Sequence, residues 1–400
     1  MAHSDPPLRK RKRSKSEENM GEEKELGGSL LKRNADRKQN LADLKTWWDG
    51  AFQRHSHSSA KNILNAALVI FGALPTVGIA VWVLSCNPTP NNGNVDDLHT
   101  MKEAYESSFR SLLYWSPLFL INFVFFINVD IIFYIIGLLQ RSFWLIDPYW
   151  TLFPSIFGLI WASHPMAVVN ARTIVANILT LIWAIRLTHS YFRRENWKFG
   201  EREDWRYTKM AMEHGKPLWY LISFFTVGVA QHPMLVGISL PLYSVAFGPY
   251  AKHSSFDWID GIITVLCLTG ITIACIADNQ LRSFMMENES RRSQGLPKIR
   301  LLRKGLWRYS RHPNYFGEQM WWWSLALFSL KVGQYWAIAG TALNSLVLAI
   351  VTVMTESKML REWPPERAAL YKQYQKEVSA CFPWFLFGRD KSSGDEDQDI

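Results

Sequence analysis

The chain has few cysteines, no apolar segment at its start, and little charge in its middle part. Its four cysteines, Cys86, Cys267, Cys275 and Cys381, form no CxxC pair, which argues against a disulfide framework and a zinc site, and we expect no metal. The first long apolar run begins near Ile63 after a charged stretch, so we expect no cleavable signal peptide. The middle of the chain instead consists of apolar runs separated by short polar loops. This pattern predicts one polytopic membrane domain rather than several soluble domains.

The apolar runs predict an all-α bundle of membrane-spanning helices. A bilayer crossing takes about 20 apolar residues. The run from Leu112 to Leu145 is too long for one crossing, and we expect two spans that turn near Asn128 and Asp130. With the shorter runs, we expect about ten spans, and a single kinked span is an alternative for the two runs within residues 218–248. The remaining runs are Ile63–Leu84, Trp150–Ser163, Arg172–His189, Leu218–Ala230, Met234–Gly248, Ile259–Ala277, Gln319–Leu330 and Trp336–Met354.

The charged residues are concentrated at the two ends of the chain. The formal net charge is +9, with a basic block at Arg9–Lys15 and an acidic end at Ser393–Ile400. We expect residues 1–60 to be a largely disordered basic cytosolic tail, residues 61–387 the membrane domain, and residues 388–400 an acidic disordered tail. The basic block is typical of a nuclear-localisation-like or sorting signal, of a segment that binds anionic lipid, or of a solvated cytosolic tail.

Three further basic stretches lie between the apolar runs, at residues 193–209, 291–313 and 358–376. Because cytosolic loops are enriched in lysine and arginine, we expect all three on the cytosolic side of the membrane, where they could converge on one polyanionic ligand.

A polar motif, GLWRYSRHPNYFGEQMWWW, adjoins an apolar run at Gly305–Trp323. We expect a helix to begin at or just after Pro313, which would place Asn314 and Glu318 on one face. Arginines beside a helix N-terminus are typical of a phosphate site, and tyrosines can stack on a planar ring. We interpret Trp321–Trp323 as an aromatic belt at the membrane interface. The other candidate binding residues of this motif are Arg308, Tyr309, Arg311, His312 and Tyr315.

A second polar pair stands at the cytosolic end of an earlier apolar run. Asp278 and Arg282 are four residues apart and therefore share a helix face. They could form a local surface ion pair or belong to a binding site, because ionisable groups at membrane depth usually have a partner or a function.

Several motifs, in order along the chain, resemble the DUF1295 branch of the steroid 5-alpha-reductase-like membrane proteins. They are REDWRY at Arg202–Tyr207, ADNQLRSF at Ala277–Phe284, GLWRYSRHPNYFGEQ at Gly305–Gln319, and the C-terminal stretch from Arg361 to Phe385. The resemblance covers about Asp147–Phe387. The wider superfamily includes sterol reductases that use NADPH and isoprenylcysteine carboxyl methyltransferases that use S-adenosylmethionine.

The resemblance implies roles for single positions. It makes Asp278, Asn279 and Arg282 cofactor contacts, and it matches Asn314 and Glu318 to residues at the nicotinamide end of the cofactor. It further implies that the stretch from Glu356 to Tyr374 closes over the adenosine phosphate. The contacts expected there are Arg361 and Tyr374.

The resemblance also implies a catalytic tyrosine, with one departure from the family pattern. Tyr191 matches a tyrosine that faces the substrate in the steroid reductases. These enzymes pair it with a glutamate, but Leu152 stands at that place here, and Asp147 is the only nearby carboxyl group. We therefore expect Tyr191 to stabilise or protonate a developing enolate, with Asp147 or Arg186 tuning it.

We expect an NADPH-dependent enzyme that reduces a C=C bond of a lipophilic substrate such as a sterol, isoprenoid or lipid. The many cationic side chains suit the three phosphates of NADPH better than the sulfonium of S-adenosylmethionine. A methyltransferase of the isoprenylcysteine type and a non-catalytic membrane scaffold are the alternatives. We expect an integral protein of the endoplasmic reticulum or nuclear envelope, with a cytosolic cofactor side and no specific nucleic-acid partner.

Overall fold

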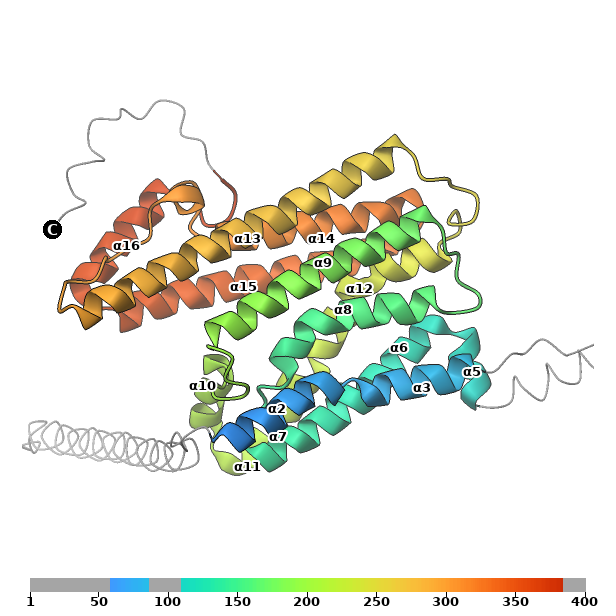
Figure 1. Cartoon of the computed structure of the whole chain (residues 1–400), viewed down its shortest axis with the longest axis horizontal. Helices are drawn as coiled ribbons and strands as arrows, with labels where there is room; N and C mark the ends of the chain where they lie inside the picture. The colour runs from blue at the N-terminus through green and yellow to red at the C-terminus, as the bar shows by residue number, and fades with distance from the viewer. Residues whose placement is uncertain (1–57, 86–108, 384–400) are drawn as a thin grey trace, which may run out of the picture. The chain divides into compact units, whose positions relative to one another are not determined.

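The computed structural model describes residues 58–85 and 109–383, and within them every regular element is helical (Figure 1). The predicted all-α membrane bundle is thus confirmed. The predicted C-terminal tail, Cys86 and residues 1–57 of the predicted N-terminal tail lie outside the described residues, and the first helix begins at Ser59. In chain order, the elements are α2 (Ser59–Phe71), α3 (Leu74–Leu84), α5 (Phe109–Trp115), α6 (Pro117–Phe125), the π-helix η1 (Phe126–Phe133), α7 (Tyr134–Gln140), α8 (Ile146–Ala162), α9 (Ala171–Arg194), α10 (Trp205–His214), α11 (Lys216–Ser223), the π-helix η2 (Phe224–Val229), α12 (Gln231–Phe247), α13 (Trp258–Ser293), the 3-10 helix η3 (Gly305–Arg308), α14 (Pro313–Lys331), the 3-10 helix η4 (Tyr335–Ala337), α15 (Ile338–Glu362) and α16 (Pro365–Glu377).

The described part of the chain contains six helices long and apolar enough to cross a membrane, so the expectation of about ten spans was too high. These helices cover Ser59–Leu84, Pro117–Gln140, Ala171–Arg194, Leu218–Phe247, Trp258–Ser293 and Tyr335–Glu362. Two predicted spans merge into Leu218–Phe247, which is the kinked-span alternative. Two others, α8 and α14, are rich in buried side chains.

The predicted turn near Asn128 and Asp130 was wrong, because one helix runs from Pro117 to Gln140. The polar residues lie in η1, where the helix widens to a π-helix, and both side chains are buried. A π-helical turn inserts a residue without ending the helix, so the chain keeps its backbone hydrogen bonds in a medium that offers none.

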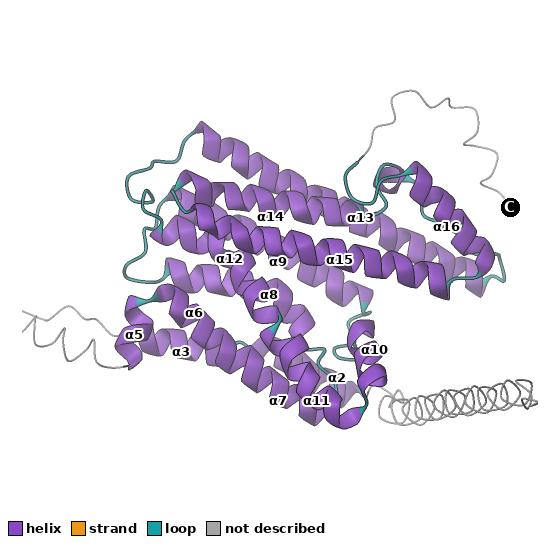
Figure 2. Cartoon of the chain, turned by 180° about the vertical axis from the view of Figure 1, so that it is seen from behind, coloured by secondary structure: helices purple, strands orange, loops and turns teal. Residues whose placement is uncertain are grey.

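The chain divides into two compact units. The described part of the first is residues 203–223, with α10 and α11, and that of the second is residues 59–85, 109–202 and 224–383. In the second unit α13 packs extensively against α14, which also contacts α15, while α9 contacts α13 and α8 (Figures 1 and 2).

Glycines allow α13 and α14 to approach closely. A Cβ atom added to Gly317 would lie 2.5 Å from the backbone nitrogen of Ala274, and one added to Gly270 would lie 2.6 Å from that of Trp321. Small residues at such a crossing let two membrane helices pack backbone to backbone. This crossing sets the spacing of the polar side chains one or two turns away on both helices.

Candidate functional site

The N-terminal half of α14 carries a polar cluster that joins three long helices. Arg186 of α9 donates to Asp278 of α13 at 3.1 Å and to Glu318 of α14. Asn314 of α14 donates to the second oxygen of Asp278 at 3.2 Å. The side chains of Arg186, Asp278 and Glu318 are 9%, 19% and 17% exposed, so the charges are largely removed from water. One cation meets two carboxylates, and we call these four residues the Arg186 cluster.

Two polar atoms of the Arg186 cluster have no hydrogen-bond partner within residues 58–85 and 109–383. They are Oδ1 of Asn314, an acceptor, and Nε of Arg186, a donor, and both atoms are buried. Unpaired buried polar atoms are costly, typically by about 1–3 kcal/mol each. The cluster therefore offers one acceptor and one donor to a polar ligand group.

The helix start and the shared face expected from the sequence are confirmed. Helix α14 begins at Pro313, where the missing N–H of proline costs no hydrogen bond. Asn314 and Glu318, one turn apart, both reach the Arg186 cluster. Asp278 pairs with Arg186 and Asn314, whereas Arg282 donates to Asn196 at 3.2 Å.

The interpretation of Trp321–Trp323 as an interfacial belt was wrong for two of the three residues. Trp321 and Trp322 are 0% and 2% exposed, and only Trp323 reaches the surface of the bundle. Their rings pack against Trp183 of α9, with centroids 6.3 and 4.7 Å away. Trp183 in turn donates to Glu318 at 2.8 Å. The tryptophans therefore form an indole layer beneath the cluster.

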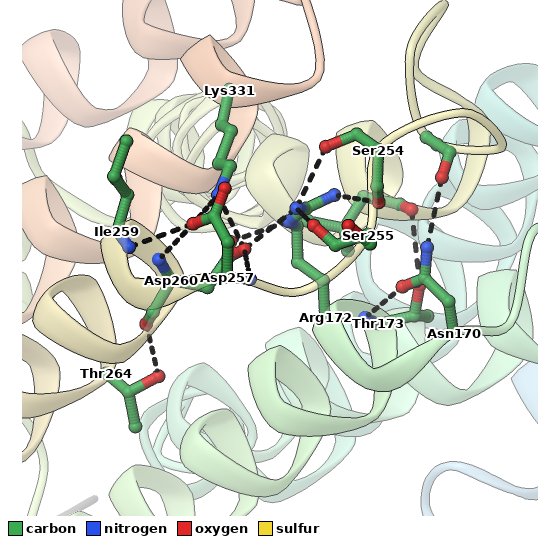
Figure 3. Close-up of polar contacts among 12 residues, drawn as sticks. Asn170, Arg172, Thr173, Ser254, Ser255, Asp257, Ile259, Asp260, Thr264 and Lys331 are labelled. Atoms are coloured by element: carbon green, nitrogen blue, oxygen red, sulfur yellow. Dashed lines mark hydrogen bonds and ion pairs between the residues drawn. The ribbon is translucent and has the colours of Figure 1, made fainter.

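A second ion network ties the opposite ends of the same three helices (Figure 3). Arg172 of α9 makes a bidentate pair with Asp260 of α13, at 2.7 and 2.8 Å, and Lys331 of α14 donates to Asp260 at 2.6 Å. Arg172 also donates to Ser254 and Ser255. On α9, Arg172 and Arg186 are 14 residues apart, which is about 21 Å along the helix. The two networks thus brace the three helices at well-separated levels.

A third network ties the turn before α14 to the C-terminal elements. Glu356 of α15 accepts from Arg311 at 2.8 Å, from His312 at 2.9 Å and from Gln375 of α16 at 2.8 Å. The ring of Tyr315 stacks on His312, with centroids 5.0 Å apart. Much of the donor capacity of Arg311 is used inside the protein, and its predicted phosphate contact stays a prediction.

The C-terminal stretch packs onto the same turn. The hydroxyl of Tyr374 donates to the carbonyl oxygens of Trp307 and Ser310, and burial raises its pKa well above the ordinary value. Arg361 is exposed at the end of α15. The structure thus brings the C-terminal stretch beside the motif, as closure over a ligand requires, whereas contact of Tyr374 or Arg361 with a phosphate stays a prediction.

Cationic side chains lie at the end of α9 and just before α14. Arg193 donates to Asn279 at 2.7 Å, which links the ends of α9 and α13. Arg308 and Tyr309 are exposed beside η3. Parts of the three basic stretches therefore lie at one end of the second unit, which is the arrangement that a polyanionic ligand would need.

Tyr191 and Asp147 lie at corresponding ends of α9 and α8. The two helices touch where Thr151 meets Thr188, and Asp147 and Tyr191 each lie one turn beyond this contact toward the same end. The guanidinium of Arg194 lies 5.4 Å from the centroid of the Tyr191 ring. Their catalytic roles stay predictions.

Sequence reasoning missed Trp183, named Glu356 only as the start of the C-terminal segment and not as a partner of Arg311 and His312, and gave Arg186 only a tuning role. The available signal was an ionisable residue inside an apolar run, which usually has a charged partner. The identity of that partner depends on helix packing, since Glu318 is 132 residues away. Within residues 58–85 and 109–383 no group of His, Cys, Asp and Glu side chains could hold a metal ion.

Comparison with protein families assigns the chain to one family. The family model described as "Protein of unknown function (DUF1295)" matches residues 133–378. An uncharacterised protein of Schizosaccharomyces pombe is 27% identical over 257 residues, which cover 60% of this chain and 72% of the relative. No solved structure matches the chain.

Proposed function

Since the chain belongs to the DUF1295 family of steroid 5-alpha-reductase-like membrane proteins, we propose that it is an NADPH-dependent reductase of a C=C bond in a lipophilic substrate. The observation that carries this proposal is the Arg186 cluster. It contains two buried polar atoms without a partner among the described residues, and Arg186 lies in the apolar span Ala171–Arg194, whose last turn carries Arg193 and Arg194. A water-soluble cofactor and a membrane-dissolved substrate can meet at such a boundary.

The residues present fit a nicotinamide head. A carboxamide carries N–H donors and one acceptor, which complement Oδ1 of Asn314 and Nε of Arg186. Arg193, Arg282 and Arg308 are the cations available for the phosphates. When bound, the reduced nicotinamide would supply the hydride that reduction of a C=C bond requires.

In this proposal Tyr191 supplies the proton or a hydrogen bond to the developing oxyanion. The adjacent guanidinium of Arg194 would stabilise negative charge on the phenol as the proton leaves. Arg186 pairs with both Asp278 and Glu318 and orients them, so these carboxylates remain fixed beside the cofactor. The indole layer beneath excludes water from the cluster.

The test is thermal stabilisation of the purified protein in detergent by NADPH. We expect a larger shift with NADPH than with NADH, and none with S-adenosylmethionine. Asn314→Ala and Glu318→Gln should weaken NADPH binding tenfold or more, because hydrogen bonds to charged groups contribute about 1.5–3 kcal/mol.

The matched control is Gln319→Ala on the same helix. Gln319 bonds to Ser345 of α15 and takes no part in the Arg186 cluster, so this variant should bind NADPH like the parent protein. A shift with S-adenosylmethionine alone would replace the reductase proposal by a methyltransferase. Unchanged NADPH binding in both cluster variants would remove the assigned site.

A further inference from the structure

A second polar cluster lies inside the bundle, partly before the family match begins at residue 133. His232 of α12 lies between two side chains of the span Pro117–Gln140. Its Nδ1 is 2.9 Å from Oδ2 of Asp130, and its Nε2 is 3.0 Å from Oδ1 of Asn122. Asp130 is 1% exposed, and the ring of Phe125 packs 4.5 Å from the imidazole. We call these three residues the His232 cluster.

The hydrogen bonds determine where the protons of the His232 cluster lie. The amide nitrogen of Asn122 donates to the carbonyl of Leu118 at 2.8 Å, so the amide oxygen is the atom that faces His232. Nε2 of His232 must therefore carry a hydrogen and donate it. One further proton then lies between Nδ1 of His232 and Oδ2 of Asp130, on either atom. The Asp130 and His232 pair is neutral overall in both arrangements.

The other oxygen of Asp130 has no partner among the residues that the structure describes. Oδ1 is buried, and no group donates a hydrogen bond to it. It is an acceptor wherever the shared proton lies, because that proton belongs to Oδ2 or to the imidazole. Oδ1 faces Gly228 of η2, where an added Cβ atom would lie 3.4 Å away. Oδ1 of Asp130 therefore lacks a hydrogen-bond donor, and the residue next to it, Gly228, has no side chain.

The His232 cluster is connected to the helix that carries Arg186 and Tyr191. Gln231, the neighbour of His232, accepts from Trp150 of α8 at 2.6 Å, and the next residue of α8, Thr151, contacts Thr188 of α9. Packed helix axes are about 8–10 Å apart. A ligand that reaches from Asp130 to α9 would have to extend past α8, so it would be an elongated molecule.

We propose that Oδ1 of Asp130 binds the hydroxyl group of a membrane-dissolved alcohol, which is the substrate of the proposed reductase. The ligand group must be a donor, because Oδ1 accepts, so a ketone or ester at this position is excluded. It is a neutral group, because the Asp130 and His232 pair has no net charge to balance an ammonium. This inference rests on the proposed function and narrows its substrate class to lipophilic molecules that carry a hydroxyl group at one position and, at a separate position, a C=C bond conjugated to the carbonyl whose oxyanion Tyr191 stabilises.

The test compares alcohols with their carbonyl counterparts as probes of thermal stability in detergent. The pairs are cholestanol with cholestanone, and farnesol with farnesal. We expect the alcohol of at least one pair to bind about fivefold more tightly than its counterpart, which is the effect of one hydrogen bond of about 1 kcal/mol. Equal stabilisation by alcohol and carbonyl compound in both pairs would overturn the proposal.

Three variants locate the effect. Gly228→Ala places a methyl group before Oδ1 at ordinary contact distance and should abolish the preference for the alcohol, whereas Gly78→Ala, whose added Cβ meets no atom within 4 Å, should keep it. Asp130→Asn should also keep it, because its amide can donate to His232 while Oδ1 still accepts. A preference that survives in Gly228→Ala would show that the alcohol binds elsewhere.

NADPH stabilisation of Gly228→Ala separates this inference from the proposed function. We expect it to equal that of the parent protein, since the Arg186 cluster is unchanged. Loss of alcohol preference with intact NADPH binding supports the inference. Absence of NADPH binding in the parent protein would reject the reductase whatever the alcohols do.

Discussion

At the residue scale, the carboxylate of Asp260 accepts hydrogen bonds from Arg172 and Lys331 (Figure 3). Arg172 and Asp260 are 1% and 0% exposed. A buried ion pair contributes little more to the free energy of unfolding than an apolar pair of similar size would. Removal of one partner, however, leaves an uncompensated buried charge. The strength of the network therefore depends on every member being present.

Asp260→Asn should lower the free energy of unfolding by about 3–5 kcal/mol, because Arg172 would remain buried without its carboxylate. Thermal unfolding in detergent measures this loss. The control is Asp257→Asn, which removes an exposed charge of the same network but keeps an oxygen that can cap α13, and its effect should be much smaller. Equal losses in the two variants would contradict the importance of burial.

At the residue scale, the sequence also identifies a charged residue that needs a partner, but it does not identify the partner. Arg186 in an apolar run signals a partner, yet Asp278 and Glu318 are separated from it by 92 and 132 residues. Only the packing of α9 against α13 and α14 decides the pairing. Composition alone predicts that Trp321 and Trp322 lie at the membrane interface. In the structure, both rings are buried in the bundle and pack against the indole of Trp183.

At the scale of elements, the crossing of α13 and α14 depends on residues without side chains. The Cβ of an alanine at position 317 would lie 2.5 Å from backbone nitrogen of Ala274, and neither backbone can move aside as a flexible side chain could. Gly261, by contrast, has no atom within 4 Å of an added Cβ. The two positions allow a matched comparison on the two helices.

Gly317→Ala should separate α13 from α14 and lower the melting temperature by several degrees, as a loss of about 1–3 kcal/mol from overpacking implies. It should also weaken NADPH binding, since Asp278 and Asn314 would move apart. Gly261→Ala should change neither property. A stable Gly317→Ala protein that binds NADPH normally would contradict the close crossing.

The boundaries of the helices were likewise predictable only in part from the sequence. The start of α14 at Pro313 was predictable, because proline fixes its own backbone angle and lacks a donor. The π-helices η1 and η2 were not, since the apolar run around Asn128 and Asp130 contains no proline or glycine from Leu118 to Ile136 and a widened turn has no short sequence signal. The predicted turn there failed because a buried partner, His232, pairs with one oxygen of Asp130 within the bundle.

At the scale of the whole molecule, the motif and the Asp260 network mark opposite ends of the long helices in the second unit. The loop between α13 and α14 carries Lys298, and the loop between α12 and α13 carries Lys252, and both residues are exposed. If the basic stretches are cytosolic, these two loops lie on opposite sides of the membrane.

Cysteine labelling in sealed vesicles tests this orientation. In a background without the four native cysteines, Lys298→Cys should react with a membrane-impermeant maleimide from the cytosolic side. Lys252→Cys should react only after permeabilisation. Labelling of both positions from one side would refute a bundle that spans the membrane in this way.

The sequence by itself determined the all-helical membrane class, the family, the start of α14, and the shared face of Asn314 and Glu318. All of these depend on composition, motif order or spacing along one helix, which are local properties. The tertiary structure decided the number of spans, the partners of Arg186, the burial of Trp321 and Trp322, and the meeting of Asp130 with His232. These features depend on contacts between helices that are far apart in the chain. In a membrane, buried polar groups need partners, but many pairings satisfy this need. Only the packing of the helices determines which pairing forms.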